Sequence, residues 1–201
     1  MGNKSNCYAI FNGKITDRES LLADAKIKSS FQIVEALYLQ KFFVSFWMGD
    51  YDEAVAASDF ALSLSSAKMP KPQLPFHIFY RGIMAFQLFR DGKGESWLAE
   101  GKAMLAQLEA WVDNSRQFFE NKLVLLESEH YASTAHVVAA KESYELAIAL
   151  ARDNGYIHEQ GLAYGEFSVL DDVLNVSCHL LISSARNYMH WQNAWANIWL
   201  L

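Results

Sequence analysis

The sequence has few of the residues that cross-link or interrupt a chain. Only 2 of its 201 residues are cysteine, Cys7 and Cys178, too few for a disulfide framework or a set of zinc ligands. Its 3 prolines all lie between Pro70 and Pro75, and it has 10 glycines. Because residues that break helices are so sparse, the composition favours long helices over a β protein with many turns.

Long apolar runs and a basic surface are also missing. The apolar segment 42–48, "FFVSFWM", is far shorter than the roughly 20 residues that a membrane-spanning helix needs. The net charge is -6, and the basic residues are scattered along the chain, which argues against nucleic acid as a partner. With so few cysteines, these features predict a cytoplasmic protein without a membrane span.

What the sequence does contain is helical periodicity and enough apolar residues, 52% of the chain, to build a core. A capping box at Thr16 and Glu19 predicts the start of a first helix. Gly49 predicts the end of a second helix, and Asp50 predicts the start of a third. We expect about nine helices and no sheet. Their predicted ranges are 16–29, 31–48, a third from residue 50, then 76–90, 95–112, 116–131 and 136–153, with two more after Gly155.

A stripe with the spacing i, i+4, i+7 recurs along the chain, with a small residue at its first and last positions, and this spacing puts its members on one helical face. Small residues let a neighbouring helix approach closely, so the recurrence predicts stacked helix pairs, an α-solenoid. An ordinary helical bundle in which alanines fall at these positions by chance is the alternative. The stripes are Ala54, Ser58 and Ala61; Ala99, Ala103 and Ala106; Ala140, Tyr144 and Ala147; and Cys178, Ile182 and Ala185.

The segment 49–62, "GDYDEAVAASDFAL", resembles the turn and second helix of a tetratricopeptide repeat. Longer segments are similar, in the same order, to the helical-repeat region of very large signalling proteins. Those proteins join a protein-kinase-like domain, an AAA-type ATPase and a sensor histidine kinase. The segments are "FHIFYRGIMA" (76–85), "ENKLVLLESEHYA" (120–132), "KESYELAIALARDNGYIHEQGLAYGEF" (141–167) and "ARNYMHW" (185–191).

The resemblance implies an all-α, right-handed solenoid of antiparallel helix pairs, at about 31–66, 76–113, 116–153 and 156–199. They would form a single domain over 16–201, after a flexible segment 1–15. It also implies a non-catalytic protein-interaction scaffold that couples signalling modules and needs no cofactor. One alternative is a regulatory module that senses a small ligand or peptide. Another is a non-functional fragment of a truncated larger signalling protein.

The adjacent pair His158 and Glu159 is the first candidate for chemistry, but a zinc-binding helix needs a second histidine four residues on, where Leu162 stands. We therefore expect no catalytic or metal site, and a first-turn role in which Glu159 suits the helix dipole. The carboxylate pairs Glu127–Glu129 and Asp171–Asp172 are too close in sequence to converge on a helix, which predicts a solvated face.

Partner binding is predicted at two places. The first is a groove lined by the first helices of successive pairs, with five candidate residues: Tyr38, Lys41, Ser45, Phe79 and Arg90. The second is the C-terminal helix, where tryptophan recurs every four residues from Trp191. Its last turns are expected to form a sticky face that promotes self-association, with candidates Trp195, Trp199 and Leu200.

Overall fold

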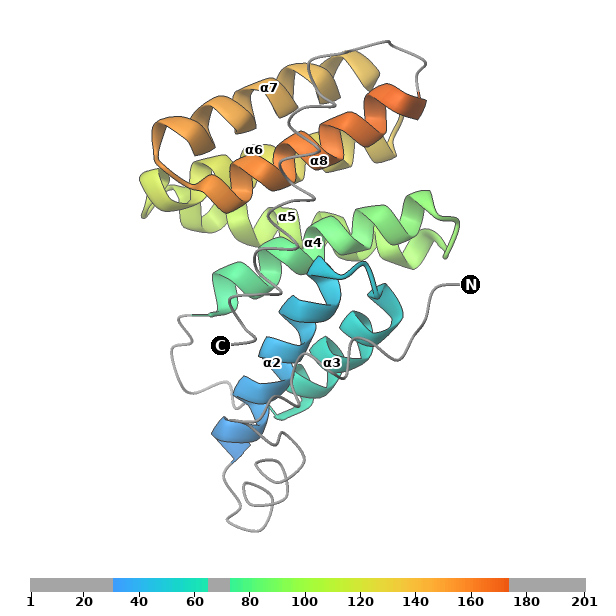
Figure 1. Ribbon diagram of the computed structural model, residues 1–201, viewed down its shortest axis with the longest axis vertical. Coiled ribbons are helices and arrows are strands. Elements are labelled where there is room, and N and C mark those ends of the chain that lie inside the picture. Colours follow the sequence, from blue (N-terminus) through green and yellow to red (C-terminus); the bar gives the residue numbers. More distant parts are fainter. Residues whose placement is uncertain (1–30, 65–72, 174–201) are drawn as a thin grey trace. The chain divides into compact units, whose positions relative to one another are not determined.

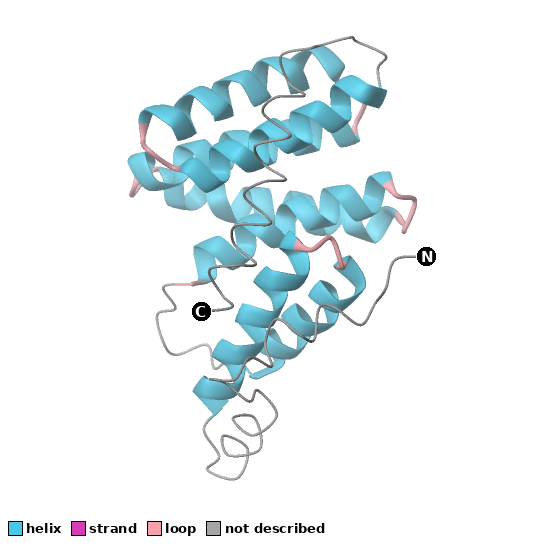
Figure 2. Cartoon of the chain, in the orientation of Figure 1, coloured by secondary structure: helices cyan, strands magenta, loops and turns pink. Residues whose placement is uncertain are grey.

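The computed structural model describes residues 31–64 and 73–173, and this part of the chain is helical, with seven helices and no strand (Figures 1 and 2). The helices fall into two compact units, which are described separately. None of the described helices is long and apolar enough to cross a bilayer. The predicted helix at 16–29 and the last predicted helix lie outside the described residues.

The first unit pairs α2 (Phe31–Trp47) with α3 (Tyr51–Leu64). Gly49 ends α2 with a φ of 71°, and Asp50 N–H bonds to Ser45 O at 2.9 Å, which closes a Schellman motif. The Asp50 side chain then accepts a hydrogen bond from Glu53 N–H at 3.3 Å, as the sequence predicts. The tight turn makes the two helices antiparallel neighbours.

The second unit contains α4 (Leu74–Arg90), α5 (Glu95–Val112), α6 (Arg116–Ser133), α7 (Val137–Asp153) and α8 (Ile157–Val173). Each helix packs against the next, and α6 also contacts both α4 and α8. Figure 1 shows α4, α6 and α8 running in the same direction, so their first turns lie at one end of the unit.

The core of the second unit is built on α4, whose residues from His77 to Ala85 are all buried. Its glycine Gly82 lies beneath α6, where an added Cβ would meet the Leu126 side chain at 2.8 Å. On α5, a Cβ on Gly101 would meet the ring of Phe86 at 2.7 Å. Glycine is therefore needed at both crossings, because the partner side chain occupies the space of a methyl group.

The structure confirms two of the predicted stripes and corrects a third. Ala54, Ser58 and Ala61 on α3 are buried, as are Ala140, Tyr144 and Ala147 on α7. On α5, however, Ala99, Ala103 and Ala106 are exposed, and the buried residues are Gly101 and Leu108. The predicted register of α5 is wrong. Exposing alanine to water costs little free energy, whereas the close fit of Gly101 under Phe86 decides which face of α5 packs against α4. The fourth stripe, from Cys178 to Ala185, lies outside the described residues.

Candidate functional site

A cavity of about 400 Å³ opens where the first turns of α4, α6 and α8 meet. We call it the aromatic cup, because four aromatic rings dominate its lining. Its position follows from the parallel course of these helices, which brings three helix starts far apart in sequence to one end of the unit. The lining residues are Pro75, Phe76, Phe118, Phe119, Lys122, Gly155, Tyr156, Ile157, His158 and Glu159.

Local sequence explains how each segment reaches the cup. Pro75 lies in the first turn of α4, where its missing N–H removes no helical hydrogen bond. Gly155 has a φ of 74°, and Tyr156 N–H bonds back to Ala151 O at 2.8 Å. This Schellman motif ends α7 and starts α8 at Ile157, so Tyr156 enters the cup directly from the turn.

A buried ion pair forms the floor of the cup. Lys122 Nζ lies 2.9 Å from Glu159 Oε1, and the two side chains are only 4% and 9% exposed. The ammonium group also lies over the ring of Tyr156, 4.4 Å from its centroid, and 5.5 Å from the centroid of Phe76. The positive charge is thus balanced by one carboxylate and covered by two ring faces, which is a favourable arrangement for a desolvated cation.

The rim of the cup is apolar and exposed. Phe118 is 61% exposed, Ile157 56% and Phe76 46%. Large apolar side chains gathered at the mouth of a cavity are typical of a contact surface for a protein or a ligand. Because Lys122 and Glu159 neutralise each other, the floor adds no net charge, and the rim offers apolar contact.

The sequence-based reading of His158 and Glu159 is confirmed in part. Glu159 lies in the first turn of α8 and His158 is exposed beside it, as expected. The burial of Glu159 against Lys122 was missed. Lys122 and Glu159 each have apolar neighbours one turn away on their helices, which is a weak signal of burial, and no sequence spacing reveals a pair on helices so far apart.

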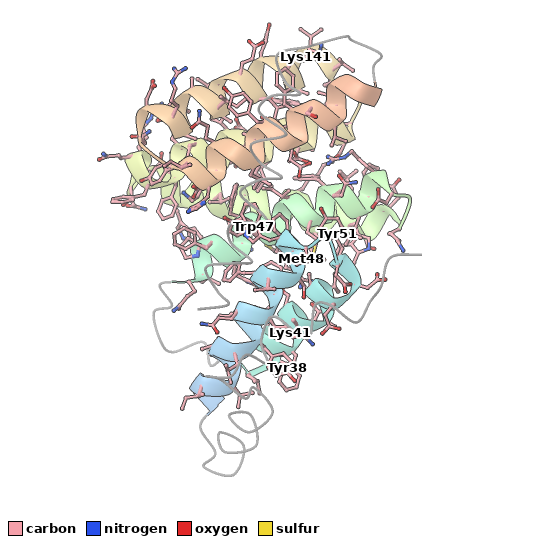
Figure 3. The ribbon with its side chains drawn as sticks, in the orientation of Figure 1. Tyr38, Lys41, Trp47, Met48, Tyr51 and Lys141 are labelled. Atoms are coloured by element: carbon pink, nitrogen blue, oxygen red, sulfur yellow. The ribbon has the colours of Figure 1, made fainter. Side chains whose placement is uncertain are left out.

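The predicted groove residues of the first unit lie on α2. Lys41 forms an ion pair with Glu53 on α3 and lies 6.0 Å from the ring centroid of Tyr38 (Figure 3). The Tyr38 ring packs against Phe60, with their centroids 4.2 Å apart. Ser45 is buried. Tyr38 and Lys41 are therefore half-buried contacts between α2 and α3, and Ser45 presents no surface to a partner.

The predicted groove residues of the second unit lie on α4. Phe79 is fully buried in the core and presents no surface to a partner. Arg90 is 23% exposed and is held by an internal ion pair. The idea that all five residues line one groove remains a prediction. Trp191, Trp195, Trp199, Leu200 and the side chains of Asp171 and Asp172 lie outside what the structure describes.

Arg90 belongs to a buried polar network that joins four helices. Its Nη2 atom lies 2.7 Å from Glu129 Oε2 on α6 and 3.7 Å from Glu166 Oε2 on α8. Tyr144 on α7 donates a hydrogen bond to Glu129 Oε1 at 2.6 Å, and Arg90 Nη1 donates to Ser133 Oγ at 3.1 Å. Two carboxyl groups thus face one guanidinium in a site with little access to water.

The electrostatics of this network follow from burial. Burial, followed by the charge of Glu129, raises the pKa of Glu166 to about 8, and Arg90 opposes the shift. The pKa of Tyr144 is raised well above its ordinary value of 10.0, mainly by burial and by the charge of Glu129. Glu166 is therefore the group that gains or loses a proton nearest neutral pH.

The prediction of a solvated face at Glu127 and Glu129 is wrong for Glu129, which is fully buried. Glu127 is half-buried, and burial, with the nearby Glu109, raises its pKa. Neighbours at i and i+2 do point apart, as expected, but one of them points inward. The inward side chain is tolerated because Arg90 and Tyr144 supply its partners.

Within residues 31–64 and 73–173, no group of three or more His, Cys, Asp or Glu side chains is arranged to hold a metal ion. Comparison with known proteins adds no constraint, because no family model, curated protein or solved structure matches the chain.

Proposed function

We propose that this chain is a non-catalytic protein-interaction scaffold and that the aromatic cup is its docking site. The observation that carries the proposal is the contrast between the rim and the floor of the cup. The rim exposes Phe76, Phe118 and Ile157, whereas Lys122 and Glu159 below it are paired with each other. Such a surface favours the burial of an apolar side chain.

We further propose a right-handed, tetratricopeptide-like solenoid. Two observations support it within the second unit: consecutive helices pack in order, and α6 contacts the first helices of the preceding and following pairs. The buried stripes on α3 and α7 share the spacing of that repeat. A role in cytoplasmic signal transduction is part of the proposal, and its support is the resemblance to the helical-repeat region of kinase-like, ATPase and histidine kinase proteins.

The cup draws on three of the four segments that carry this resemblance. Phe76 comes from "FHIFYRGIMA", Lys122 from "ENKLVLLESEHYA", and Tyr156, His158 and Glu159 from "ARDNGYIHEQ". A single surface that gathers residues from separate segments is a natural place for a partner to dock. The partner we propose is a protein or peptide that inserts a bulky apolar side chain between Phe76, Phe118 and Tyr156.

A displayed library of random peptides, selected on the full chain, tests the proposal. We expect selected peptides to share an aromatic or branched aliphatic anchor. The Phe118→Asp variant should bind them about tenfold or more weakly, because a carboxylate is placed at the apolar rim. The matched control is Val138→Asp, at a residue 71% exposed on α7 and outside the cup. Equal binding by both variants would place the docking site elsewhere.

A small-ligand sensor is the second candidate function, and the size of the cup favours it. Its volume of about 400 Å³ falls in the range of small-molecule sites, roughly 300–1,000 Å³. A fragment screen by NMR separates the two functions. Fragments that shift the resonances of Tyr156 and Phe118 at micromolar concentration support a sensor. Peptide binding without such fragments supports the scaffold.

A further inference from the structure

The interior network of Arg90, Glu129, Tyr144 and Glu166 contains more negative charge than it can neutralise. One guanidinium faces two carboxyl groups, and both contact the same nitrogen atom, Nη2. Among the described residues, the only other side chain that bonds to either carboxyl is Tyr144, whose hydroxyl is neutral. If both glutamates were ionised, the buried site would hold one uncompensated negative charge, which is costly in a poorly solvated interior.

The two carboxyl groups differ in how well their contacts support a negative charge. Glu129 accepts the Tyr144 hydroxyl at 2.6 Å and lies 2.7 Å from Arg90, so its charge is well supported. Glu166 lies 3.7 Å from Arg90, a weaker contact, and its side chain is only 14% exposed. Glu166 therefore has the weaker support for a negative charge, and these contacts favour a proton on its carboxyl.

We propose that the Glu166 carboxyl holds a proton beside Arg90 and Glu129, and that loss of this proton loosens the packing of α8 against α6 and α7. The proton removes the excess negative charge from the network. When it leaves for solvent, two carboxylates face each other across one guanidinium. The resulting repulsion weakens the packing of α8 most, because Glu166 has the longer contact to Arg90 and is the less firmly held of the two carboxylates.

The groups that face Glu166 come from every described helix packed around it. They are Arg90 from α4, Glu129 from α6 and the Tyr144 phenol from α7. Arg90 stays charged throughout, because Glu129 raises its already high pKa despite burial. Tyr144 keeps its proton because its own pKa is raised. Glu166, whose pKa burial raises to about 8, is therefore the group on which the proposal rests.

The next residue on α8 explains how the titration reaches the helix packing. Phe167 stacks on the ring of Tyr144, with their centroids 5.5 Å apart. The same tyrosine donates to Glu129, so one side chain joins the apolar contact of α8 to the charged site. The first turn of α8 also supplies Ile157 and Glu159 to the aromatic cup. The proposal concerns the docking of α8 and holds whatever the cup binds.

Hydrogen exchange of the full chain tests the proposal. Amide protection is measured from pH 5 to 9.5 and corrected for the intrinsic exchange rate at each pH. We expect the protection of α8 to fall with rising pH, by up to about tenfold per pH unit between roughly pH 5 and 8, and to level off above. The amides of α4 serve as the internal reference and should change much less.

Two variants define the comparison. Glu166→Gln cannot lose a proton, so its α8 protection should be flat across the same range. Glu142→Gln, at an exposed position on α7, should behave as the unmodified chain does. If α8 protection of the unmodified chain does not depend on pH, or if Glu166→Gln retains the dependence, the proposal is overturned.

A direct titration covers the case in which Glu166→Gln does not fold. The side-chain carboxyl resonances of 13C-labelled unmodified protein are followed with pH. A glutamate that titrates near pH 8 and is broadened with the α8 amides supports a proton held on Glu166. If every glutamate titrates below about pH 5.5, close to the ordinary pKa for this side chain, the proposal is overturned.

Discussion

The helices α6 and α8 meet in two layers that use the same spacing and opposite electrostatics. In the first layer Lys122 pairs with Glu159, at the floor of the aromatic cup. In the second, two helical turns further along both helices, Glu129 stands beside Glu166, and Arg90 reaches in from α4. The first layer is balanced by one opposite charge, whereas the second is balanced only if a proton stays bound.

This difference shows how one helix pair serves two purposes. A balanced, aromatic-covered pair fixes the shape of the cup, because each charge meets its partner within the same buried site. An unbalanced layer makes the packing of the same helix depend on proton concentration. The spacing along the helices does not distinguish the layers, because the distinction comes from the identity of one residue, lysine or glutamate, on α6.

The largest expected effect comes from breaking the balanced layer. Glu159→Gln leaves the Lys122 ammonium buried without its carboxylate, which should lower the free energy of unfolding by about 3 kcal/mol. Lys122→Met should cost a similar amount, because Glu159 is then left alone. Urea denaturation followed by circular dichroism measures both.

The double variant Lys122→Met with Glu159→Gln is the control for this first prediction. It should be much less destabilised than the sum of the single variants, because no uncompensated charge remains. Strict additivity of the two losses would mean that the two side chains do not interact as the structure places them.

The next largest effect on stability is expected when the excess negative charge of the unbalanced layer is removed at Glu166. The pKa of Glu166 is about 8 when folded and 4.5 for an ordinary glutamate. Between these values the folded chain keeps a proton that the unfolded chain releases, so the contribution of Glu166 to stability is full below about pH 4.5 and lost by about pH 8. Glu166→Gln should therefore stabilise the protein at pH 8.5 by about 2 kcal/mol or more relative to its effect at pH 4.5.

Thermal unfolding of both forms across this pH range measures the effect. The informative quantity is how the difference between the two forms changes with pH, since a glutamine also changes hydrogen bonding at every pH. A difference that is constant from pH 4.5 to 8.5 contradicts the prediction.

A smaller effect is expected when the unbalanced layer loses its neutral donor. Tyr144→Phe removes the hydrogen bond to Glu129 and keeps the ring that stacks on Phe167. Because the acceptor is charged and buried, the loss should be about 1.5–3 kcal/mol of unfolding free energy at pH 7. The matched comparison is Tyr156→Phe in the balanced layer, whose hydroxyl makes only a long, exposed 3.5 Å contact with Gln117 O and should matter little.

The smallest expected effect lies outside both layers and tests the corrected register of α5. Gly101→Ala places a methyl group against the Phe86 ring and should cost about 1 kcal/mol, since crowding outweighs the gain in helix propensity. Ala103→Gln, on the exposed side of α5, should change stability by less than about 0.5 kcal/mol. Equal losses of unfolding free energy in the two variants would support the register predicted from the sequence, in which Ala103 lies on the buried face of α5.

Helix ends in the described region were predictable to within two or three residues because their signals are local. Gly49 and Gly155 take up positive φ, and Asp50 caps the following helix through its own side chain. One end was less obvious: the turn that follows α6 is made by Ala135, a residue without glycine's freedom but with a φ of 61°. Its left-handed turn is held by the bond from His136 N–H to Tyr131 O at 2.9 Å.

The candidate site was much less predictable. The search for chemistry singled out His158 and Glu159, and the structure does place them in the cup, but Lys122 and Phe118 were not recognised as their neighbours. The groove residues Ser45 and Phe79 are buried. Apolar and small residues on the first helix of a pair pack into the core and are then not accessible to a partner.

By itself the sequence determined that the described chain is helical and where most of those helices begin and end, since periodicity, caps and turn glycines act within a few residues of each other. The tertiary structure alone decided which face of α5 is buried, which charges meet between α6 and α8, and that three helix starts form one cup. These outcomes depend on the close packing of side chains from helices distant in sequence, and on the electrostatic cost of burying their charges.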